Sequence, residues 1–226
     1  MSGMNRIVIL GGHGTVALLA TQRFVAEGYT VDSVIRDPAQ RQEVKTAGGA
    51  PVMLDLEAAT VEDLVAILSD AAAVVFAAGA GGGDAQRTHA VDYEAATRAM
   101  AAAEKAGVQR FVMVSYCNAA TDHERLDPED AFYPYAKAKH DADAYLRQTG
   151  LDYTILGPAR LTDEDETGAI QLISETSGEW PEEQRITSRA NVAAVIVEVV
   201  QTGAAIGQTV NFYDGNIQIT AVLRWL

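Results

Sequence analysis

The sequence predicts a doubly wound α/β domain, in which helices cover both faces of a parallel sheet. Short apolar runs rich in β-branched residues alternate with segments of helical periodicity along almost the whole chain. The first run, Arg6–Leu10, breaks directly into glycines, and a helical pattern follows. With 226 residues, 48% of them hydrophobic, the chain suits one domain, residues 1–226, with a large core.

The strands are expected where apolar runs are bounded by turn residues. In chain order we predict them at residues 6–10, 30–35, 50–54, 73–78, 110–115, 152–156 and 209–213. Between residues 157 and 187 the periodicity is poor, and Gly, Pro and acidic residues are frequent. We interpret that segment as an irregular region on the substrate side. The apolar tail, residues 216–226, is expected to dock on the body of the domain.

Capping residues place the helices between these strands. Asp37 is a predicted N-cap with Pro38 at the first helical position, Thr60 and Asp63 form a predicted capping box, and Ser188 caps the last helix. The helices are predicted over residues 14–27, 37–48, 60–68, 88–106, 133–149 and 189–201.

The glycine turn after the first strand indicates a Rossmann-type domain. Gly11 allows a sharp backbone turn, Gly14 carries no Cβ that would block a phosphate, and Ala17 lets helix and strand pack closely. The free N–H groups and the positive end of the following helix then face an anion. The sequence therefore predicts a dinucleotide pyrophosphate at this turn.

Charge and cysteine content narrow the classes of partner. The net charge of −14 argues against nucleic acid and anionic membranes. No apolar run is long enough to span a membrane, and no signal peptide is evident. The single cysteine, Cys117, suits a reducing compartment, so we expect a cytoplasmic protein. The four histidines show no metal-ligand spacing, and the acidic run at 163–166 is interpreted as a solvated loop, so no metal is expected.

The end of the second strand bears on the choice of cofactor. An NAD site usually places an acidic residue there, whereas this chain has Arg36, whose guanidinium suits a 2′-phosphate. Asp37 is explained as a helix cap. The pattern favours NADP(H) over NAD(H), although Arg36 could also be an ordinary exposed residue.

A Tyr and a Lys spaced four apart suggest acid–base chemistry on the helix at 133–149. Tyr135 and Lys139 lie on one helical face, and so do Tyr133 and Lys137. A nearby ammonium lowers a phenol pKa, which suits a tyrosine that exchanges a proton with a carbonyl or an alcohol. Either pair could also be a solvated helix face, and spacing does not choose between them.

The chain resembles the short-chain dehydrogenase/reductase superfamily, most closely its atypical NAD(P)H-binding members, which include epimerase/dehydratase-like proteins. The resemblance covers nearly the whole chain. Its marks are the glycine turn with Ala17, Arg36-Asp37-Pro38, Asp55-Leu56, Ala77-Ala78-Gly79, Val91-Asp92-Tyr93, the run 110–115, the run 150–158, and Leu161-Thr162-Asp163-Glu164.

The resemblance implies a set of site residues. The family pattern Pro-Tyr-x-x-x-Lys followed by an acid matches Pro134, Tyr135, Lys139 and Asp143, so Tyr135 and Lys139 correspond to the active pair. The implied cofactor contacts are Gly11, His13, Gly14, Thr15 and Val16 at the pyrophosphate, Arg36 at the 2′-phosphate, Asp55 and Leu56 beside adenine, Ala77, Ala78 and Gly79 beneath the ribose, and Pro158 near the nicotinamide.

Two positions depart from the family pattern. Ser115 matches the first of two common serines, but the second, which polarises the substrate carbonyl, is Tyr116 here. The arginine common before Pro158 is Gly157, while Arg160 follows later. Both departures concern the substrate side.

Three functions follow from these observations. The first is an NADPH-dependent oxidoreductase that reduces a small carbonyl compound, with Tyr135 as the acid, Lys139 as its pKa-lowering partner and Ser115 as a helper. The second is a non-catalytic NADP(H) sensor, and the third is an enzyme similar to sugar-nucleotide epimerases and dehydratases. The expected partners are the dinucleotide and an unknown small substrate, in a monomer or homodimer.

Overall fold

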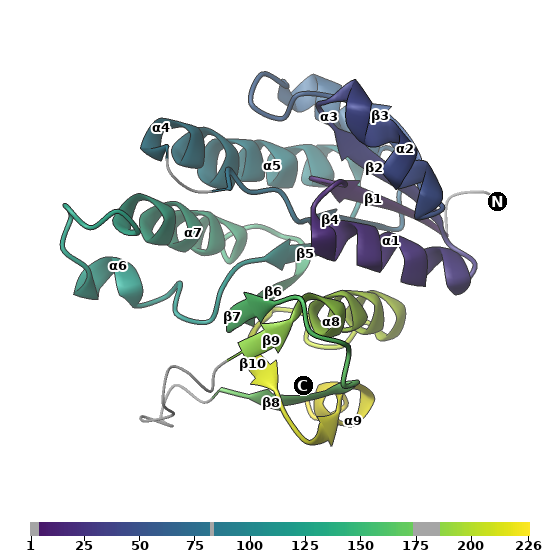
Figure 1. The fold of residues 1–226 in the computed structure, drawn as a ribbon. Helices are drawn as coiled ribbons and strands as arrows, with labels where there is room; N and C mark the ends of the chain where they lie inside the picture. Colours follow the sequence, from purple (N-terminus) through teal and green to yellow (C-terminus); the bar gives the residue numbers. More distant parts are fainter. Residues whose placement is uncertain (1–4, 82–83, 174–185) are drawn as a thin grey trace.

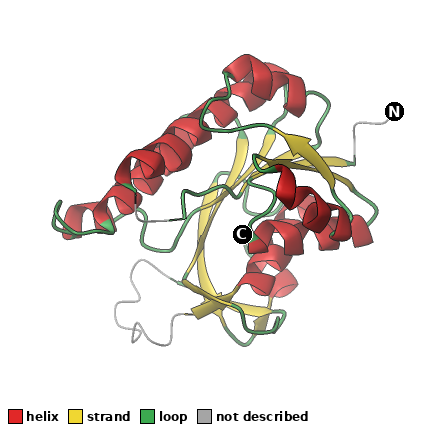
Figure 2. Cartoon of the chain, turned by 45° about the horizontal axis from the view of Figure 1, so that its top comes forward, coloured by secondary structure: helices red, strands yellow, loops and turns green. Residues whose placement is uncertain are grey.

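The computed structural model describes residues 5–81, 84–173 and 186–226. Within these residues a nine-stranded, mostly parallel sheet forms the centre, and helices cover both of its faces (Figures 1 and 2). The predicted doubly wound α/β fold is therefore confirmed.

Seven strands run parallel in the order β3-β2-β1-β4-β5-β6-β10. The order reverses at β1 and β4, which are neighbours, and such a reversal is where α/β sheets bind ligands. The bounds are β1 (Arg6–Leu10), β2 (Thr30–Ile35), β3 (Ala50–Met53), β4 (Ala73–Phe76), β5 (Arg110–Val114), β6 (Asp152–Pro158) and β10 (Gln208–Asp214).

The segment expected to be irregular, residues 157–187, and the tail both contribute short strands. β8 (Ala169–Leu172) pairs antiparallel with β10, and β11 (Ile217–Gln218) pairs antiparallel with β8, so both extend the sheet. A second, two-stranded sheet joins β7 (Arg160–Thr162) to β9 (Ile186–Ser188). Residues 174–185, with Trp180, lie outside the described residues. These strands are two to four residues long, too short for periodicity to reveal them.

Each face of the sheet has its own core, because alternate strand residues point to opposite sides. Ile7 and Ile9 join one cluster with α1 and α8, whereas Val8 and Leu10 join the other with α3, α5 and α7. The bounds of these helices are α1 (Thr15–Ala26), α3 (Val61–Leu68), α5 (Ala96–Ala106), α7 (Tyr133–Leu146) and α8 (Arg189–Thr202). The tail docks as predicted, since Ile219, Val222 and Leu223 of α9 (Ile219–Leu223) enter the first cluster.

The predicted caps form. The Asp37 side chain accepts a hydrogen bond from the Ala39 N–H at 2.9 Å, and Pro38 opens a 3₁₀-helix η1 (Pro38–Gln40) that leads into α2 (Arg41–Thr46). Thr60 and Asp63 form both hydrogen bonds of a capping box at α3. Ser188 accepts from the Asn191 N–H at α8. Local sequence thus sets the starts of these helices.

The helix predicted over 88–106 is built differently. It begins earlier, as α4 (Ala85–Thr88), continues as a π-helix η2 (His89–Ala95) and becomes α-helical only in α5. A π-turn inside an α-helix shifts the faces that its residues present, and it frequently marks a functional site. Here the π-helix carries the buried residue Asp92. None of the helices in the described part of the chain is long and apolar enough to cross a membrane.

Candidate functional site

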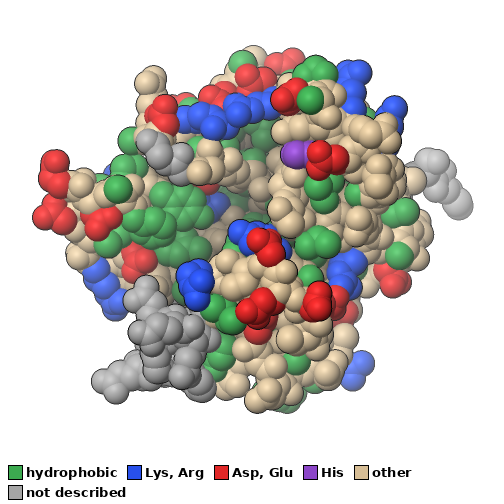
Figure 3. Space-filling view, in the orientation of Figure 1, with side chains coloured by type: hydrophobic (Ala, Val, Ile, Leu, Met, Phe, Trp, Pro, Cys, Tyr) green, Lys and Arg blue, Asp and Glu red, His purple; other side chains and the backbone are tan. Residues whose placement is uncertain are grey.

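Two pockets adjoin at the carboxyl ends of the parallel strands and share a wall, residues Ala77, Ala78 and Gly79 after β4. Figure 3 shows the molecule hollowed between its upper part and a gathering of hydrophobic side chains on the left. The first pocket is lined by Gly11, His13, Gly14, Val34, Ile35, Arg36, Gln40, Leu54, Asp55, Leu56, Glu57, Ala77, Ala78, Gly79, Arg87 and Val91. Most of the predicted cofactor residues therefore lie together.

The glycines of the first turn have different reasons to be glycine. Gly11 has φ +83°, and a Cβ there would lie 2.5 Å from the Ala78 Cα. A Cβ on Gly12 would lie 2.5 Å from the Ser33 Cβ. Gly14, the N-cap of α1, has φ −58°, and a Cβ there would meet nothing closer than 3.6 Å. The fold requires Gly11 and Gly12, whereas Gly14 leaves space over the start of α1.

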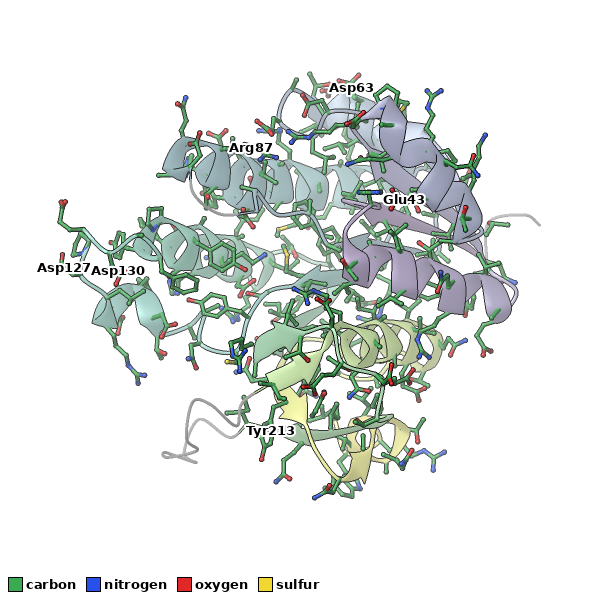
Figure 4. The ribbon with its side chains drawn as sticks, in the orientation of Figure 1. Glu43, Asp63, Arg87, Asp127, Asp130 and Tyr213 are labelled. Atoms are coloured by element: carbon green, nitrogen blue, oxygen red, sulfur yellow. The ribbon has the colours of Figure 1, made fainter. Side chains whose placement is uncertain are left out.

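Two guanidinium groups converge at the far end of the first pocket. The Glu57 Oε1 atom accepts hydrogen bonds from Arg36 Nη1 and from Arg87 Nε, both at 2.9 Å. Arg87 comes from α4 and also donates to the Ala80 carbonyl at 2.8 Å (Figure 4). Arg36 is exposed at the end of β2. Arg36 and Arg87 together can hold one negatively charged oxygen group, as they hold the Glu57 carboxylate here. The sequence indicated only Arg36.

The remaining predicted cofactor residues lie close to this pocket or beyond it. His13 lines it, with Nε2 3.1 Å from Glu43 Oε2 of α2 (Figure 4). Thr15 and Val16 form the first turn of α1, with Thr15 exposed and Val16 buried. Pro158 ends β6 and is buried; it does not line either pocket.

The second pocket, of about 890 Å³, contains the three predicted catalytic residues. The size falls in the range of small-molecule sites. It is lined by Ala77, Ala78, Gly79, Gly81, Asp84, Ala85, Thr88, Asp92, Val114, Ser115, Pro128, Glu129, Asp130, Ala131, Phe132, Pro134, Tyr135, Lys139 and Leu161.

The two candidate Tyr–Lys pairs have different surroundings. Tyr135 and Lys139 line the second pocket, and Lys139 is 2% exposed. Its Nζ atom donates to the Val114 carbonyl at 2.7 Å. Lys137 is exposed and donates to Asp141 Oδ2 at 2.7 Å, one turn along α7. The geometry therefore joins Tyr135 and Lys139 to a cavity and leaves Lys137 in a surface ion pair.

Two buried carboxylates accompany Lys139. Asp92 accepts a hydrogen bond from the Ala80 N–H at 3.0 Å, and its Oδ1 atom lies 3.9 Å from Lys139 Nζ. Asp143 accepts a hydrogen bond from the Ser115 hydroxyl at 2.6 Å. Burial raises the pKa of both carboxyl groups, and Lys139 partly opposes that rise. Ser115 is thus engaged with Asp143, which suits positioning better than carbonyl polarisation.

The pKa of Tyr135 differs from the expectation drawn from the sequence. Burial raises it above the ordinary value of 10, and the negative charges of Asp92 and Asp143 raise it further. The shift runs opposite to the expected lowering by an ammonium, because burial of the phenol is the largest cause and both carboxylates add to it. Tyr135 is therefore a protonated phenol at neutral pH.

Sequence reasoning missed Arg87 and Phe132, and it gave Asp92 no role. Arg87 and Asp92 are remote in sequence from Glu57 and Lys139, which they contact. Phe132 is only three residues before Tyr135, but it belongs to no motif, and its place in the pocket is visible only in the structure. The acidic segment after β7 faces arginines: Asp163 pairs with Arg189 at 2.7 Å, and Glu166 pairs with Arg23. These pairs explain the acidic run as part of the surface.

Comparisons with known proteins identify the family of this chain. Residues 11–203 match the model of a family described as NAD(P)H-binding. A UPF0659 protein of Schizosaccharomyces pombe is 33% identical, over 96% of this chain and 92% of its own. A Bacillus halodurans structure, provisionally named an NAD-dependent epimerase/dehydratase, is 31% identical with a TM-score of 0.86, covering 98% and 99% of the chains. The oxidoreductase YlbE of Lactococcus lactis is 30% identical with a TM-score of 0.81, covering 98% and 96%.

Proposed function

The chain belongs to the NAD(P)H-binding family, and from that premise we propose that it is an NADPH-dependent oxidoreductase that reduces a small carbonyl compound. The observation that carries the proposal is the shared wall between the two pockets. A glycine-lined pocket at the start of α1 adjoins a pocket that contains Tyr135 and Lys139. The similar YlbE of L. lactis is named an oxidoreductase.

The first pocket fits the dinucleotide chemically. The uncovered start of α1 offers N–H groups and a positive helix end to the pyrophosphate, with Gly14 leaving room for it. Arg36 and Arg87 would hold the 2′-phosphate, Asp55 and Leu56 would flank adenine, and Ala77–Gly79 would support the ribose. Arg36 and Arg87 converge on the same atom, Glu57 Oε1, and this convergence of two guanidinium groups is the basis for proposing NADPH rather than NADH.

Tyr135 acts as the general acid in this proposal. Reduced cofactor, when bound, supplies a hydride to the carbonyl carbon. Tyr135 gives its phenolic proton to the carbonyl oxygen, which completes the alcohol. A phenol of ordinary pKa is already protonated at neutral pH, so Tyr135 has a proton to give; the burial that raises its pKa makes it a weaker acid. Lys139, fixed by the Val114 carbonyl, would orient the ribose.

Ser115, Asp143 and Asp92 serve as positioning residues. Asp143 fixes the Ser115 hydroxyl, and Asp92 holds the Ala80 backbone and neighbours Lys139. A buried ammonium with carboxylate partners keeps its place, because moving it alone would leave buried charges unpaired. Together these contacts hold the active pair against the sheet.

Calorimetric titration with NADPH and NADH, followed by an assay of NADPH oxidation with small carbonyl compounds, tests the proposal. Tyr135→Phe should lower turnover by roughly a hundredfold or more while NADPH binding stays nearly unchanged. Tyr133→Phe, on the same helix, is the matched control and should keep full turnover. Equal turnover in Tyr135→Phe, or no binding of either nucleotide, would overturn the assignment.

Two other functions give different results in the same experiment. Epimerase or dehydratase chemistry is favoured by the name of the similar B. halodurans protein, and it predicts oxidised cofactor that co-purifies with the protein. A redox sensor predicts nucleotide binding without turnover of any carbonyl compound. The cytoplasmic location and the monomeric or dimeric state expected from the sequence stay predictions.

A further inference from the structure

The second pocket has an aromatic wall at the start of α7. Phe132, 43% exposed, and Tyr135 both line the pocket, and their ring centroids are 5.2 Å apart. Tyr116 stands behind them, 5.6 Å from Phe132 and 5.5 Å from Tyr135. Exposed rings held in such a cluster offer a face or an edge to another ring. In Figure 3 hydrophobic side chains gather on this side of the hollow.

The charges on the pocket lining are negative at the mouth. Asp84, Glu129 and Asp130 line the pocket and are exposed. Asp84 accepts a hydrogen bond from the backbone N–H of Arg87 at 3.0 Å. Asp130 accepts one from the backbone N–H of Phe132 at 2.7 Å. These bonds fix the carboxylates without neutralising them. Asp127 lies in the same loop before α7 (Figure 4).

No free cation on the described lining balances these carboxylates. Lys139 is the single basic side chain among the described residues of this pocket, and it is buried against the Val114 carbonyl and Asp92. By contrast, the first pocket presents two arginines, which share Glu57, together with Asp55 and the start of α1. The first pocket thus offers cationic groups and a helix start to an anion, whereas the described lining of the second offers exposed carboxylates and no exposed cation, which suits a ligand without negative charge.

We propose that the second pocket takes an uncharged aromatic carbonyl compound and rejects carbonyl compounds that carry a carboxylate, a phosphate or a diphosphate. The inference rests on the proposed function for its reaction: a hydride reaches the carbonyl carbon and a Tyr135 proton reaches the oxygen. It also separates this chain from enzymes of sugar nucleotides, whose diphosphate would face Asp84, Glu129 and Asp130.

Binding of non-reactive probes tests the inference independently of turnover. Methyl benzoate, benzoate and methyl cyclohexanecarboxylate are titrated by NMR into the full-length protein saturated with NADP⁺. Methyl benzoate should bind roughly tenfold more tightly than benzoate, because a carboxylate meets three like charges. It should also bind more tightly than the cyclohexane ester, which has no ring face. Benzoate binding as tightly as its ester would overturn the inference.

Variants assign the selectivity to the proposed residues. Glu129→Gln combined with Asp130→Asn, which keeps an acceptor for the Phe132 N–H, should shrink the ester-to-acid ratio by several-fold. Phe132→Ala should weaken the binding of methyl benzoate by roughly two- to tenfold. Phe132→Leu should weaken it as well if the aromatic ring itself makes the contact. Tyr145→Ala, an exposed aromatic near the other end of α7, is the control. A ratio unchanged in the charge variant would also overturn the inference.

Reduction assays then separate the two proposals. Methyl 4-formylbenzoate and 4-formylbenzoate are compared as substrates with NADPH. If both are reduced equally, the substrate class proposed here is wrong and the oxidoreductase proposal stands. If the probes discriminate and no carbonyl compound is reduced, the pocket preference stands and the proposed function fails.

Discussion

Asn211 fills the space that a side chain at position 157 would need. The two residues are register partners on β10 and β6, and a Cβ on Gly157 would lie 2.0 Å from Asn211 Oδ1. A side chain at position 157, such as the arginine that the resemblance implies there, would clash with Asn211. We therefore expect Gly157 and Asn211 to be coupled in packing.

Gly157→Ala should destabilise the fold by about 1–3 kcal/mol through overpacking. The cost should fall markedly in an Asn211→Ala background, where the obstructing amide is gone. Urea unfolding of the two single variants and the double variant measures this coupling. An equal cost of Gly157→Ala in both backgrounds would show that Asn211 is not the obstacle.

Gly11→Ala and Gly14→Ala should separate folding from ligand binding. Gly11→Ala forces a positive φ and a clash with Ala78, and we expect a loss of about 3 kcal/mol or more in the free energy of unfolding. Gly14→Ala meets no protein atom closely and should leave stability unchanged or slightly higher.

The NADPH affinity of Gly14→Ala should nevertheless fall by roughly ten- to a hundredfold, because the added Cβ would occupy the space proposed for the pyrophosphate and push it out of hydrogen-bond reach of the N–H groups. Thermal unfolding without nucleotide and calorimetric titration with NADPH report the two effects. An unchanged affinity in Gly14→Ala would place the pyrophosphate elsewhere.

Arg36→Ala and Arg87→Ala should each weaken NADPH by roughly tenfold or more, while NADH changes little. Both side chains donate to Glu57, so either substitution removes one of the two guanidinium groups that we propose hold the 2′-phosphate. Arg41→Ala, an exposed arginine at the start of α2 that lines neither pocket, is the control. Equal affinity of the unaltered protein for NADPH and NADH would contradict the prediction.

Asp143→Asn should flatten the pH dependence of stability. Burial raises the pKa of Asp143 in the folded state above its ordinary value of 3.8. At pH values between the ordinary pKa and the raised pKa of the folded state, the folded state binds more protons than the unfolded state. The stability contribution of Asp143 therefore falls as pH rises through that window. Asn keeps an acceptor for Ser115 and does not titrate.

Urea unfolding at several pH values from 4 to 7 measures this effect. The difference in stability between Asp143→Asn and the unaltered protein should move in favour of the variant as pH rises. Asp141→Asn, on the same helix and half-buried beside Lys137, is the control. A difference that does not change with pH would mean that Asp143 does not carry the raised pKa.

The sequence predicted features that local chemistry determines. The capping box of Thr60 and Asp63, the cap at Ser188 and the turn at Gly11 depend on a few neighbouring residues, and all three are present. The parallel strands followed from their apolar runs. In contrast, β8 is short and owes its place to pairing with β10, so periodicity could not find it.

The site was predicted where residue type and position coincide in one motif. Tyr135, Lys139 and the glycine turn came from such motifs. Arg87 depends on tertiary packing, which brings α4 beside Glu57. Phe132 is the N-cap of α7 and a sequence neighbour of Tyr135, but that it lines a cavity is visible only in the structure. The direction of the Tyr135 pKa shift likewise depends on burial and on two distant carboxylates.

The three residues that separate the pockets give them a common structural element. Ala77–Gly79 forms one wall of each pocket, so a ligand that shifts this segment on one side reshapes the other side. Coupling between two binding sites is reciprocal. If the nucleotide changes the affinity for the second ligand by some factor, the second ligand changes the affinity for the nucleotide by the same factor. Any cooperativity carried by this segment would therefore appear equally in the titration of either ligand.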